Sequence, residues 1–334
     1  MADESHSGPS RRRLLSILAA LPATALPGAA WARRLRPVTW RGVALGADAQ
    51  LTLVHHDEAM AWRAIGRCID EIARLEKVFS LYEPESQVSR LNRQGHLDDP
   101  ESDLLRLLST AKAVSDRTGG AFDVTVQPLF AYHRRLGSSA ATEVPATLRA
   151  LVGYRQFALS SRRVGFRQPG MALTLNGIAQ GYISDRVADL LRAAGFANAL
   201  IGLGETVALG HDATGDAWRV AIADPDRDGQ FLARLPLRRG ALATSAPAGL
   251  TFDAAGKRHH LLEPSSGHSA GHYRSLTVLA PNATLADGLS TGLAVTPPDR
   301  LRRLLASMPE VGVLAVDRNG IRHRLGRLGK SGFG

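Results

Sequence analysis

A change in the hydrophobic period near residue 56 constrains the fold of this chain more than any other sequence feature. Between residues 44 and 55, apolar residues alternate with polar or small ones, as in a strand. Between residues 58 and 78 they recur at spacings of three to five, which predicts an amphipathic helix with one buried face, capped by Asp57. A strand followed at once by such a helix favours an α+β fold.

Further elements continue this pattern to the end of the chain. Helices are predicted over 103–118, stopped by Gly119 and Gly120, over 179–194, stopped by Gly195, and over 285–295. Short strands are predicted at 159–166, 172–175, 199–203, 218–223, 274–279 and 311–316. No repeat or internal linker divides the sequence, so we expect one compact α+β domain with mixed or antiparallel sheets and packed helices.

The N-terminal 32 residues have a different character. Paired arginines at Arg11 and Arg12 precede an apolar run, and a small-x-small site ends at Ala32. This order predicts a cleaved twin-arginine signal peptide over 1–32, and therefore a periplasmic protein. A membrane anchor is the alternative, but prolines interrupt a run shorter than the roughly 20 residues that span a bilayer. The domain is then expected over 33–325, with a flexible tail over 326–334.

Composition limits the classes of function. The whole chain has a formal charge of +10, which suits phosphate-bearing or acidic partners. Its arginines are scattered and lack interleaved aromatic residues, so nucleic acid is not an expected partner. Cys68 is the only cysteine, which excludes an intramolecular disulfide and leaves stability to the core.

Two segments contain groups suited to phosphate and cation chemistry. Residues 173–182 run from an apolar segment through Gly177 into a helix, whose N-terminus would present N–H groups to an anion. Asp287 and Thr291 lie four residues apart, so their oxygens share one helix face and suit a hard cation such as magnesium or calcium. Purely structural roles remain open: a tight turn at Gly177, and a cap or solvent contact at Asp287.

Other polar and aromatic residues leave similar alternatives. His259 and His260 are expected on opposite faces of a strand, and either could be a general base or part of an exposed basic edge. Tyr82 and Phe122 could line an aromatic ring such as a flavin or adenine, or simply occupy loops. The sequence has no nucleophile elbow, Walker loop or cysteine zinc motif.

Taken in order, five segments between residues 79 and 293 resemble the FAD:protein FMN transferase family, also called the ApbE family. The segments are FSLYEPESQVSRLN, TGGAFDVTVQPL, LNGIAQGYISDRVADLLRAAG, HHLLEPSSG and APNATLADGLSTGL. The resemblance implies a T-fold-related domain. It also implies that FAD is cleaved, FMN is joined through its phosphate to a threonine or serine of a target protein, and AMP leaves. The form of the central motif with Thr174, and the segment 243–247, look most like the exported NosX-like branch associated with nitrous-oxide reductase maturation.

The resemblance also assigns roles to residues of this sequence. His260 and Asp287 become the catalytic residues, with His259 as the alternative base. The magnesium ligands, with calcium as the alternative ion, become Gly177, Asp287, Ser290 and Thr291. The FAD pocket is then lined by Leu45, Tyr82, Ala121, Phe122, Asp123, Thr174, Gln180 and Leu262. The implied partners are FAD and an acceptor protein, for which a membrane flavoprotein of the nitrous-oxide reductase system is one candidate.

Several positions depart from the family pattern. Thr174 stands where aspartate is usual, Gln180 where lysine is frequent, and Glu205-Thr206 where a Gly-Asp pair is usual. These changes keep three alternatives open: an FAD-binding protein without transfer, a magnesium-dependent FAD pyrophosphatase that uses water, and a basic periplasmic scaffold protein.

Overall fold

A computed structural model describes residues 35–44, 46–137 and 143–330 of the chain. The predicted signal peptide over 1–32 and the predicted pocket residue Leu45 lie outside these residues. Within them, no helix is long and apolar enough to cross a membrane.

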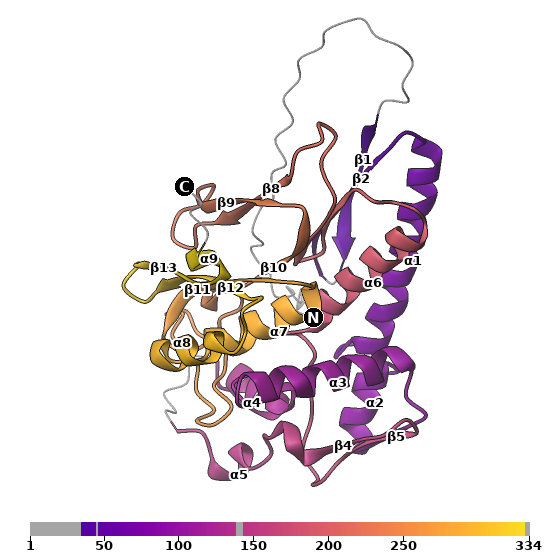
Figure 1. Cartoon of the computed structure of the whole chain (residues 1–334). Helices are drawn as coiled ribbons and strands as arrows, with labels where there is room; N and C mark the ends of the chain where they lie inside the picture. The colour runs from indigo at the N-terminus through magenta and orange to yellow at the C-terminus, as the bar shows by residue number, and fades with distance from the viewer. Residues whose placement is uncertain (1–34, 45, 138–142, 331–334) are drawn as a thin grey trace, which may run out of the picture.

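An eight-stranded sheet forms the centre of the molecule, and all its neighbouring strands are antiparallel (Figure 1). In spatial order the strands are β1 (Arg36–Ala44), β2 (Ala47–His55), β6 (Ala199–Gly202), β7 (Thr206–Leu209), β10 (Arg239–Ser245), β11 (Tyr273–Ala280), β12 (Gly312–Asp317) and β13 (Arg322–Gly326). The spatial order of these strands follows their order in the chain, with residues 56–198 forming a long connection from β2 to β6.

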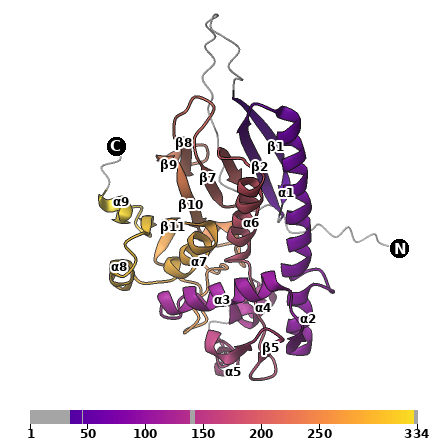
Figure 2. The ribbon, with the colours of Figure 1, turned by 45° about the vertical axis from the view of Figure 1, so that its right-hand side comes forward.

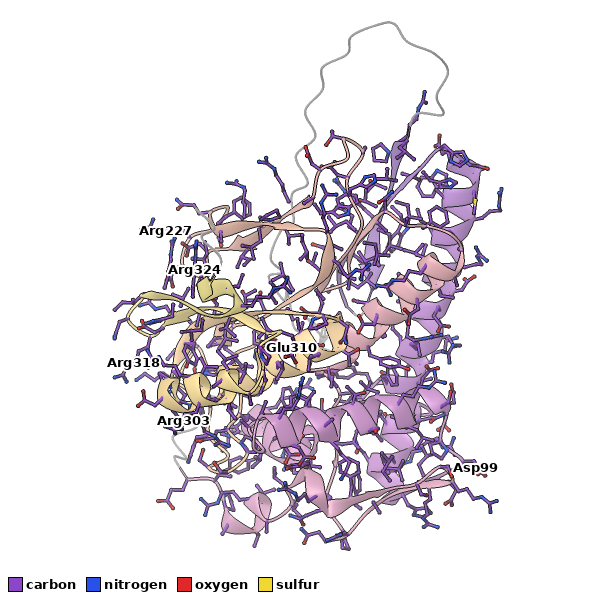
Figure 3. All side chains as sticks on the ribbon, viewed as in Figure 1. Asp99, Arg227, Arg303, Glu310, Arg318 and Arg324 are labelled. Carbon is purple, nitrogen blue, oxygen red and sulfur yellow. The ribbon has the colours of Figure 1, made fainter. Side chains whose placement is uncertain are left out.

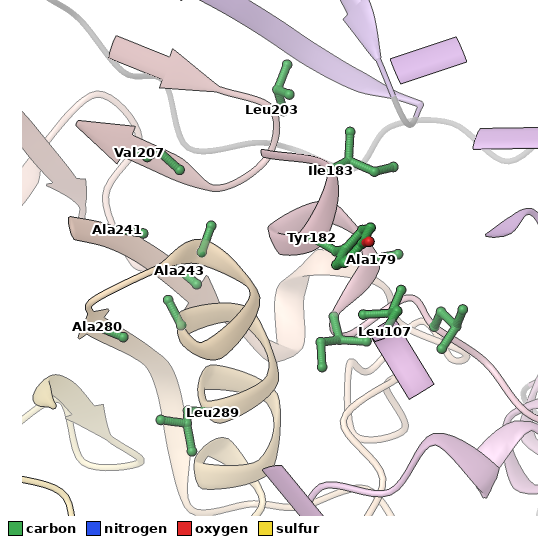
Figure 4. Close-up of a cluster of buried hydrophobic side chains, with 14 of the residues drawn as sticks. Leu107, Ala179, Tyr182, Ile183, Leu203, Val207, Ala241, Ala243, Ala280 and Leu289 are labelled. Carbon is green, nitrogen blue, oxygen red and sulfur yellow. The ribbon is translucent and has the colours of Figure 1, made fainter. Parts of the chain in front are cut away.

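Helices α1 (Glu58–Phe79), α6 (Ala179–Ala193) and α7 (Ala283–Ala294) pack their apolar faces together with the sheet in the main core. Figure 4 shows part of this core, in which Ile183 of α6 and Leu289 of α7 lie near Val207 and Ala243 of the strands. The predicted cap of α1 is confirmed, since the Asp57 carboxylate accepts from the Met60 N–H at 2.8 Å.

The hairpin of β8 (Trp218–Ala223) and β9 (Phe231–Leu237) packs against a second set of sheet residues, the alternates of those in the main core. Trp218 and Ile222 lie in this second cluster with Leu200, Leu242 and Leu314. Figure 3 shows Arg227, Arg318 and Arg324 at the neighbouring edge, where all three are exposed. The positive charge there lies on a solvated surface.

The lower part of the molecule in Figure 2 is mostly helical. It contains α2 (Gln87–Gln94), α3 (Ser102–Arg117), α4 (Gln127–Leu136), α5 (Ala146–Arg149), and the small sheet β3 (His96–Asp98), β5 (Arg163–Phe166) and β4 (Phe157–Leu159). The described chain also has the short 3-10 helices η1 (Val124–Val126), η2 (Tyr154–Gln156) and η3 (Pro247–Gly249), and the C-terminal helices α8 (Pro298–Ala306) and α9 (Arg327–Lys330).

The structure corrects several sequence-based boundaries. The predicted strand 159–166 is divided between β4 and β5, which pair as a hairpin. Residues 172–175 form no strand, because their backbone groups bond to the Asn92 side chain and to Val124. The strand expected to carry His259 and His260 is reduced to an isolated antiparallel bridge between Thr251 and His259. The flexible tail expected from residue 326 is wrong as far as residue 330: α9 forms there, and its Leu328 is buried against the second cluster.

Candidate functional site

Helices α6 and α7 cross at Gly181, and this close approach builds the candidate site. A Cβ at Gly181 would overlap the backbone carbonyl of Ala283, so only glycine allows the contact. The Gly181 N–H donates to Oδ2 of the buried Asp287 at 3.0 Å. Gly181 therefore serves the packing of two helices.

Three of the predicted metal ligands come together beside this crossing. The Thr291 hydroxyl lies 3.4 Å from the carbonyl oxygen of Gly177, and Asp287 lies one helical turn before Thr291. Ser290 turns toward the sheet, where its hydroxyl lies 2.8 Å from that of Ser245 in β10 and donates to the Asp287 carbonyl at 3.0 Å. The backbone and side-chain oxygens thus lie between the start of α6 and the middle of α7.

Glu205 is a second buried carboxylate at this place that the sequence reasoning missed. It is 7% exposed, and its buried Oε2 has no hydrogen-bond partner in the part of the chain that the structure describes. Burial raises the pKa of Glu205 well above its usual range, and the nearby Asp287 carboxylate raises it further. In the sequence, Glu205 stood out only as a departure from the family pattern. Its burial was not predicted, because a glutamate after a predicted strand is usually exposed.

The chemistry of these groups fits a hard cation. Among the described residues no cluster of three or more His, Cys, Asp or Glu side chains could hold a metal ion. The group at the α6–α7 crossing instead offers a carbonyl, hydroxyls and carboxylates. Oxygen donors of this kind suit magnesium or calcium, and among the described residues one carboxylate oxygen of Glu205 has no hydrogen-bond partner.

The segment with the predicted flavin contacts Ala121, Phe122 and Asp123 lies against α7. Phe122 is 3% exposed, and a Cβ at Gly292 would lie 2.7 Å from its Cβ, so the phenylalanine ring belongs to the core. The Asp123 carboxylate accepts from the N–H groups of Thr125 and Tyr154, both at 2.8 Å, while burial raises its pKa. Phe122 and Asp123 therefore fix the shape of the segment, and Ala121 remains half-buried at its surface.

Thr174 lies beside the segment of Ala121, Phe122 and Asp123, whereas Tyr82 lines a separate cavity. The Thr174 N–H donates to the Val124 carbonyl at 2.8 Å, which holds Thr174 beside the 121–126 segment. Tyr82 is 71% exposed and lines a cavity of about 630 Å³ between α2, α4 and α5. Ala172 lines this cavity too, whereas Asp287 and Thr291 do not, so the cavity is separate from the cation ligands. Gln180 lies in the first turn of α6, against Gly204.

The loop of residues 246–272 holds the histidines and Leu262. His259 is 4% exposed, and burial lowers its pKa. His260 is half-buried, with Nδ1 at 3.1 Å from the Leu250 carbonyl. A carbonyl can only accept, so Nδ1 carries the proton and Nε2 is the basic nitrogen of His260. Leu262 is buried in a small apolar cluster with Leu129 and Val144.

Comparison with known proteins identifies the protein family of this chain. Residues 45–315 match the ApbE family, and the chain belongs to that family. An FAD:protein FMN transferase of Klebsiella pneumoniae is 30% identical over 296 residues, covering 85% of this chain and 90% of that protein. One of Haemophilus influenzae is 31% identical over 238 residues, covering 66% and 69%.

Solved structures confirm the predicted fold class. The ApbE protein of Thermotoga maritima superposes with a TM-score of 0.77 at 25% identity, covering 87% of this chain and 97% of that one. The flavin transferase ApbE of Vibrio cholerae gives 0.75 at 23% identity, covering 88% and 99%. The single α+β domain with antiparallel sheets is therefore the ApbE fold.

Proposed function

We propose that this chain is an FAD:protein FMN transferase. The observation that carries the proposal is the meeting of the Gly177 carbonyl, Asp287 and Thr291 at the α6–α7 crossing. These oxygens lie where two helices far apart in sequence are held together by a glycine contact, in a chain that belongs to the ApbE family and whose relatives carry this name. FAD is then the substrate, and a protein hydroxyl is the acceptor.

The reaction requires one P–O bond to break and another to form. The bond between the FMN phosphorus and the bridging oxygen of the FAD diphosphate breaks, the acceptor hydroxyl oxygen bonds to that phosphorus, and AMP leaves. A bound magnesium ion, held by Asp287, Thr291 and the Gly177 carbonyl, would neutralise the diphosphate charge, with calcium as the alternative ion. Ser290 supports this set by fixing the last turns of α7 against β10.

His260 is the proposed general base for the acceptor hydroxyl. The Leu250 carbonyl holds the proton on Nδ1, which orients the ring and leaves Nε2 as the nitrogen that accepts a proton. The half-buried position of His260 favours it over the buried His259, because an acceptor protein must approach the base from solvent.

The proposed FAD pocket extends from the cation ligands toward the separate cavity that Tyr82 lines. The half-buried residues Ala121, Thr174 and Gln180 offer contacts with the substrate, and Tyr82 offers an exposed aromatic face for stacking. The other proposed pocket residues, Phe122, Asp123 and Leu262, are buried and set the shape of the pocket walls. Leu45 completes the set on the basis of the family resemblance alone.

We also propose that the protein works in the periplasm after twin-arginine export, as a NosX-like member that serves nitrous-oxide reductase maturation. The arginine pair and cleavage site within residues 1–32 support export, and Thr174 with the segment 243–247 supports the branch. The acceptor would be a membrane flavoprotein of that system. Replacing both Arg11 and Arg12 by lysine should leave the protein in the cytoplasmic fraction; unchanged periplasmic yield would contradict the twin-arginine route.

The test of the transferase is the intact mass of an acceptor domain after incubation with the protein, FAD and magnesium. An acceptor that carries the target threonine should gain the mass of FMN less one water, while a threonine-to-alanine acceptor should gain nothing. The gain should disappear when EDTA removes the cation. Free FMN and AMP beside an unmodified acceptor would instead indicate a pyrophosphatase, and bound but intact FAD a flavin-binding protein.

A further inference from the structure

Glu205 occupies a turn that directs its side chain inward. The turn joins β6 to β7 and is closed by a hydrogen bond from the Leu203 N–H to the Glu205 carbonyl at 3.0 Å. Gly204 adopts φ +92°, a left-handed conformation that favours glycine, and a Cβ there would lie 2.8 Å from the Gln180 amide nitrogen. The glycine therefore allows the turn to pack on the start of α6, with Glu205 inside the molecule.

Among the described residues, no cationic side chain acts on Glu205. The Thr244 N–H of β10 donates to the carboxylate, and Asp287 of α7 is the acidic group that acts on it. Its Oε2 is buried and makes no hydrogen bond within the described part of the chain. The turn with Glu205 packs on Gln180, and the next residue of α6, Gly181, bonds to Asp287, so both carboxylates belong to one buried place. Interacting carboxylates repel each other and a buried oxygen without a partner costs free energy, so this arrangement favours a cation there.

A nearby carboxylate shows that the fold does not require such a carboxylate to lack hydrogen-bond partners. Asp185, in the same helix α6, is also mostly buried, yet it accepts from the N–H groups of Ala283 and Thr284 at 2.8 Å each. It also accepts from the Thr284 hydroxyl. Asp185 thus anchors the start of α7 with full hydrogen bonding, whereas Glu205 anchors nothing through Oε2.

We propose that Glu205 is a further ligand of the cation at Asp287, so that this chain holds its metal with two carboxylates. The inference rests on the proposed function for the identity of the site and adds a residue to it. A second carboxylate strengthens the binding of a divalent cation, since affinity rises with the number of charged ligands. The protein should therefore bind the cation before FAD arrives, without needing the diphosphate oxygens as ligands.

The test measures Mn²⁺ binding to the flavin-free protein by the loss of the free-ion signal in electron paramagnetic resonance. Glu205→Gln keeps the size and the Thr244 hydrogen bond but removes the charge. It should raise the Kd for Mn²⁺ at least tenfold, while the EDTA-treated variant melts at the same temperature as wild type or higher. The increase in melting temperature on adding Mn²⁺ should shrink in parallel.

The matched control is Asp185→Asn, which removes another buried carboxylate of the same region. It should lower the melting temperature equally with and without Mn²⁺ and leave the Kd unchanged. Glu205→Asp retains the charge on a shorter side chain and should bind Mn²⁺ more tightly than Glu205→Gln.

The inference is overturned if wild type binds no Mn²⁺ without flavin, or if Glu205→Gln binds it as wild type does. A Glu205→Gln protein that melts at a lower temperature in EDTA and keeps the full Mn²⁺ shift would assign Glu205 a structural role instead. The acceptor-mass assay on wild type reports the proposed function separately. A wild-type protein that transfers FMN while Glu205→Gln binds Mn²⁺ normally would defeat only the inference about Glu205.

Discussion

Helix α6 contacts buried carboxylates in two regions, and the two are stabilised in opposite ways. In the first region, Asp103 of α3 accepts from the Tyr182 hydroxyl and from the Arg74 guanidinium, both at 2.6 Å. In the second, Asp287 acts on the buried Glu205, and one oxygen of Glu205 makes no hydrogen bond to any described residue. Tyr182 and Gly181, neighbours in α6, serve the two regions separately.

The electrostatics of the two regions differ in the same way. Burial acts to raise the pKa of Asp103, but Tyr182 and Arg74 outweigh it and hold that pKa below its usual value. Glu205 has no such partners, and its pKa is raised. The carboxylate of the Asp103 region has its partners within the protein, whereas in the Asp287 region the cation that we propose would supply the missing partner. The difference separates a structural ion pair from a binding site, although both are buried and acidic.

The largest effect is expected for Asp287→Asn. The amide keeps an oxygen for the Gly181 N–H but removes the charge that would hold the cation. FMN transfer should fall on the order of 10³-fold, because a metal supplies several kcal/mol of charge stabilisation and each ~1.4 kcal/mol is tenfold in rate. The melting temperature should change little in EDTA. A rate within a few-fold of wild type would show that the Asp287 region does not hold a cation that FMN transfer needs.

His259 and His260 also differ in burial, since His259 is buried and His260 is half-buried. His260→Ala should slow FMN transfer about 100-fold or more, the usual worth of a general base, while FAD binding measured by fluorescence titration stays within a few-fold. His259→Ala should act mainly on stability. Transfer that is lost from folded His259→Ala but kept in His260→Ala would assign the base to His259.

Protonation should also separate the two histidines. Burial lowers the pKa of His259, so the native state loses stability as the pH falls below the usual histidine value of 6.5, where the unfolded chain gains a proton that the buried ring resists. Removing His259 should therefore weaken this acid sensitivity in urea unfolding at pH 5 to 8. An unchanged pH profile in His259→Ala would show that other groups cause it.

Asp103→Asn tests whether the Asp103 region serves stability alone. The variant loses the charged contact with Arg74, which should cost about 2 kcal/mol of unfolding free energy, less than for a fully buried pair because Arg74 is partly exposed to solvent. FMN transfer per folded molecule should stay near that of wild type. A large loss of transfer in the folded variant would mean that the two regions are not independent.

The pH dependence of Asp103→Asn carries a definite sign. Since the folded pKa of Asp103 is lowered, its contribution to stability is fully present above the usual aspartate value of 3.8 and is lost as the pH falls through the lower, folded value. The difference in unfolding free energy between wild type and variant should therefore be constant from pH 5 to 7 and shrink only in strong acid.

The sequence predicted the parts of the fold that local patterns determine. Helix α1 and its Asp57 cap, α3 with its glycine stop, and β8 agree with the predicted ranges to within one residue. The strand predicted over 172–175 failed, because its backbone bonds to the Asn92 side chain and to Val124, and such tertiary partners leave no periodic pattern. The packed Leu328 was missed because a short basic tail resembles a frayed end.

The residues of the candidate site differ in the same way: local patterns predicted some of them, and tertiary contacts determine the others. Asp287 and Thr291 were found because helical spacing alone puts them on one face. Glu205 was not found, since its burial depends on the packing of the β6–β7 turn against Gln180 and on the distant α7. The separate duties of Gly181 and Tyr182 could not be predicted either, because their partners come from α7 and α3.

The smallest expected effect comes from Gln180→Lys, which would make the second region resemble the first. The Gln180 amide lies against Gly204, the residue before Glu205, so a lysine ammonium there would come within reach of the Glu205 carboxylate. The flavin-free, EDTA-treated variant should unfold with about 1 kcal/mol more free energy than wild type, and Mn²⁺ should bind more weakly because the ammonium competes for Glu205. Gln180→Met is the matched control, since it has similar length but no charge and should give neither change. If Gln180→Lys and Gln180→Met behave alike in both measurements, Glu205 is not short of a counter-charge, and the contrast with Asp103 fails.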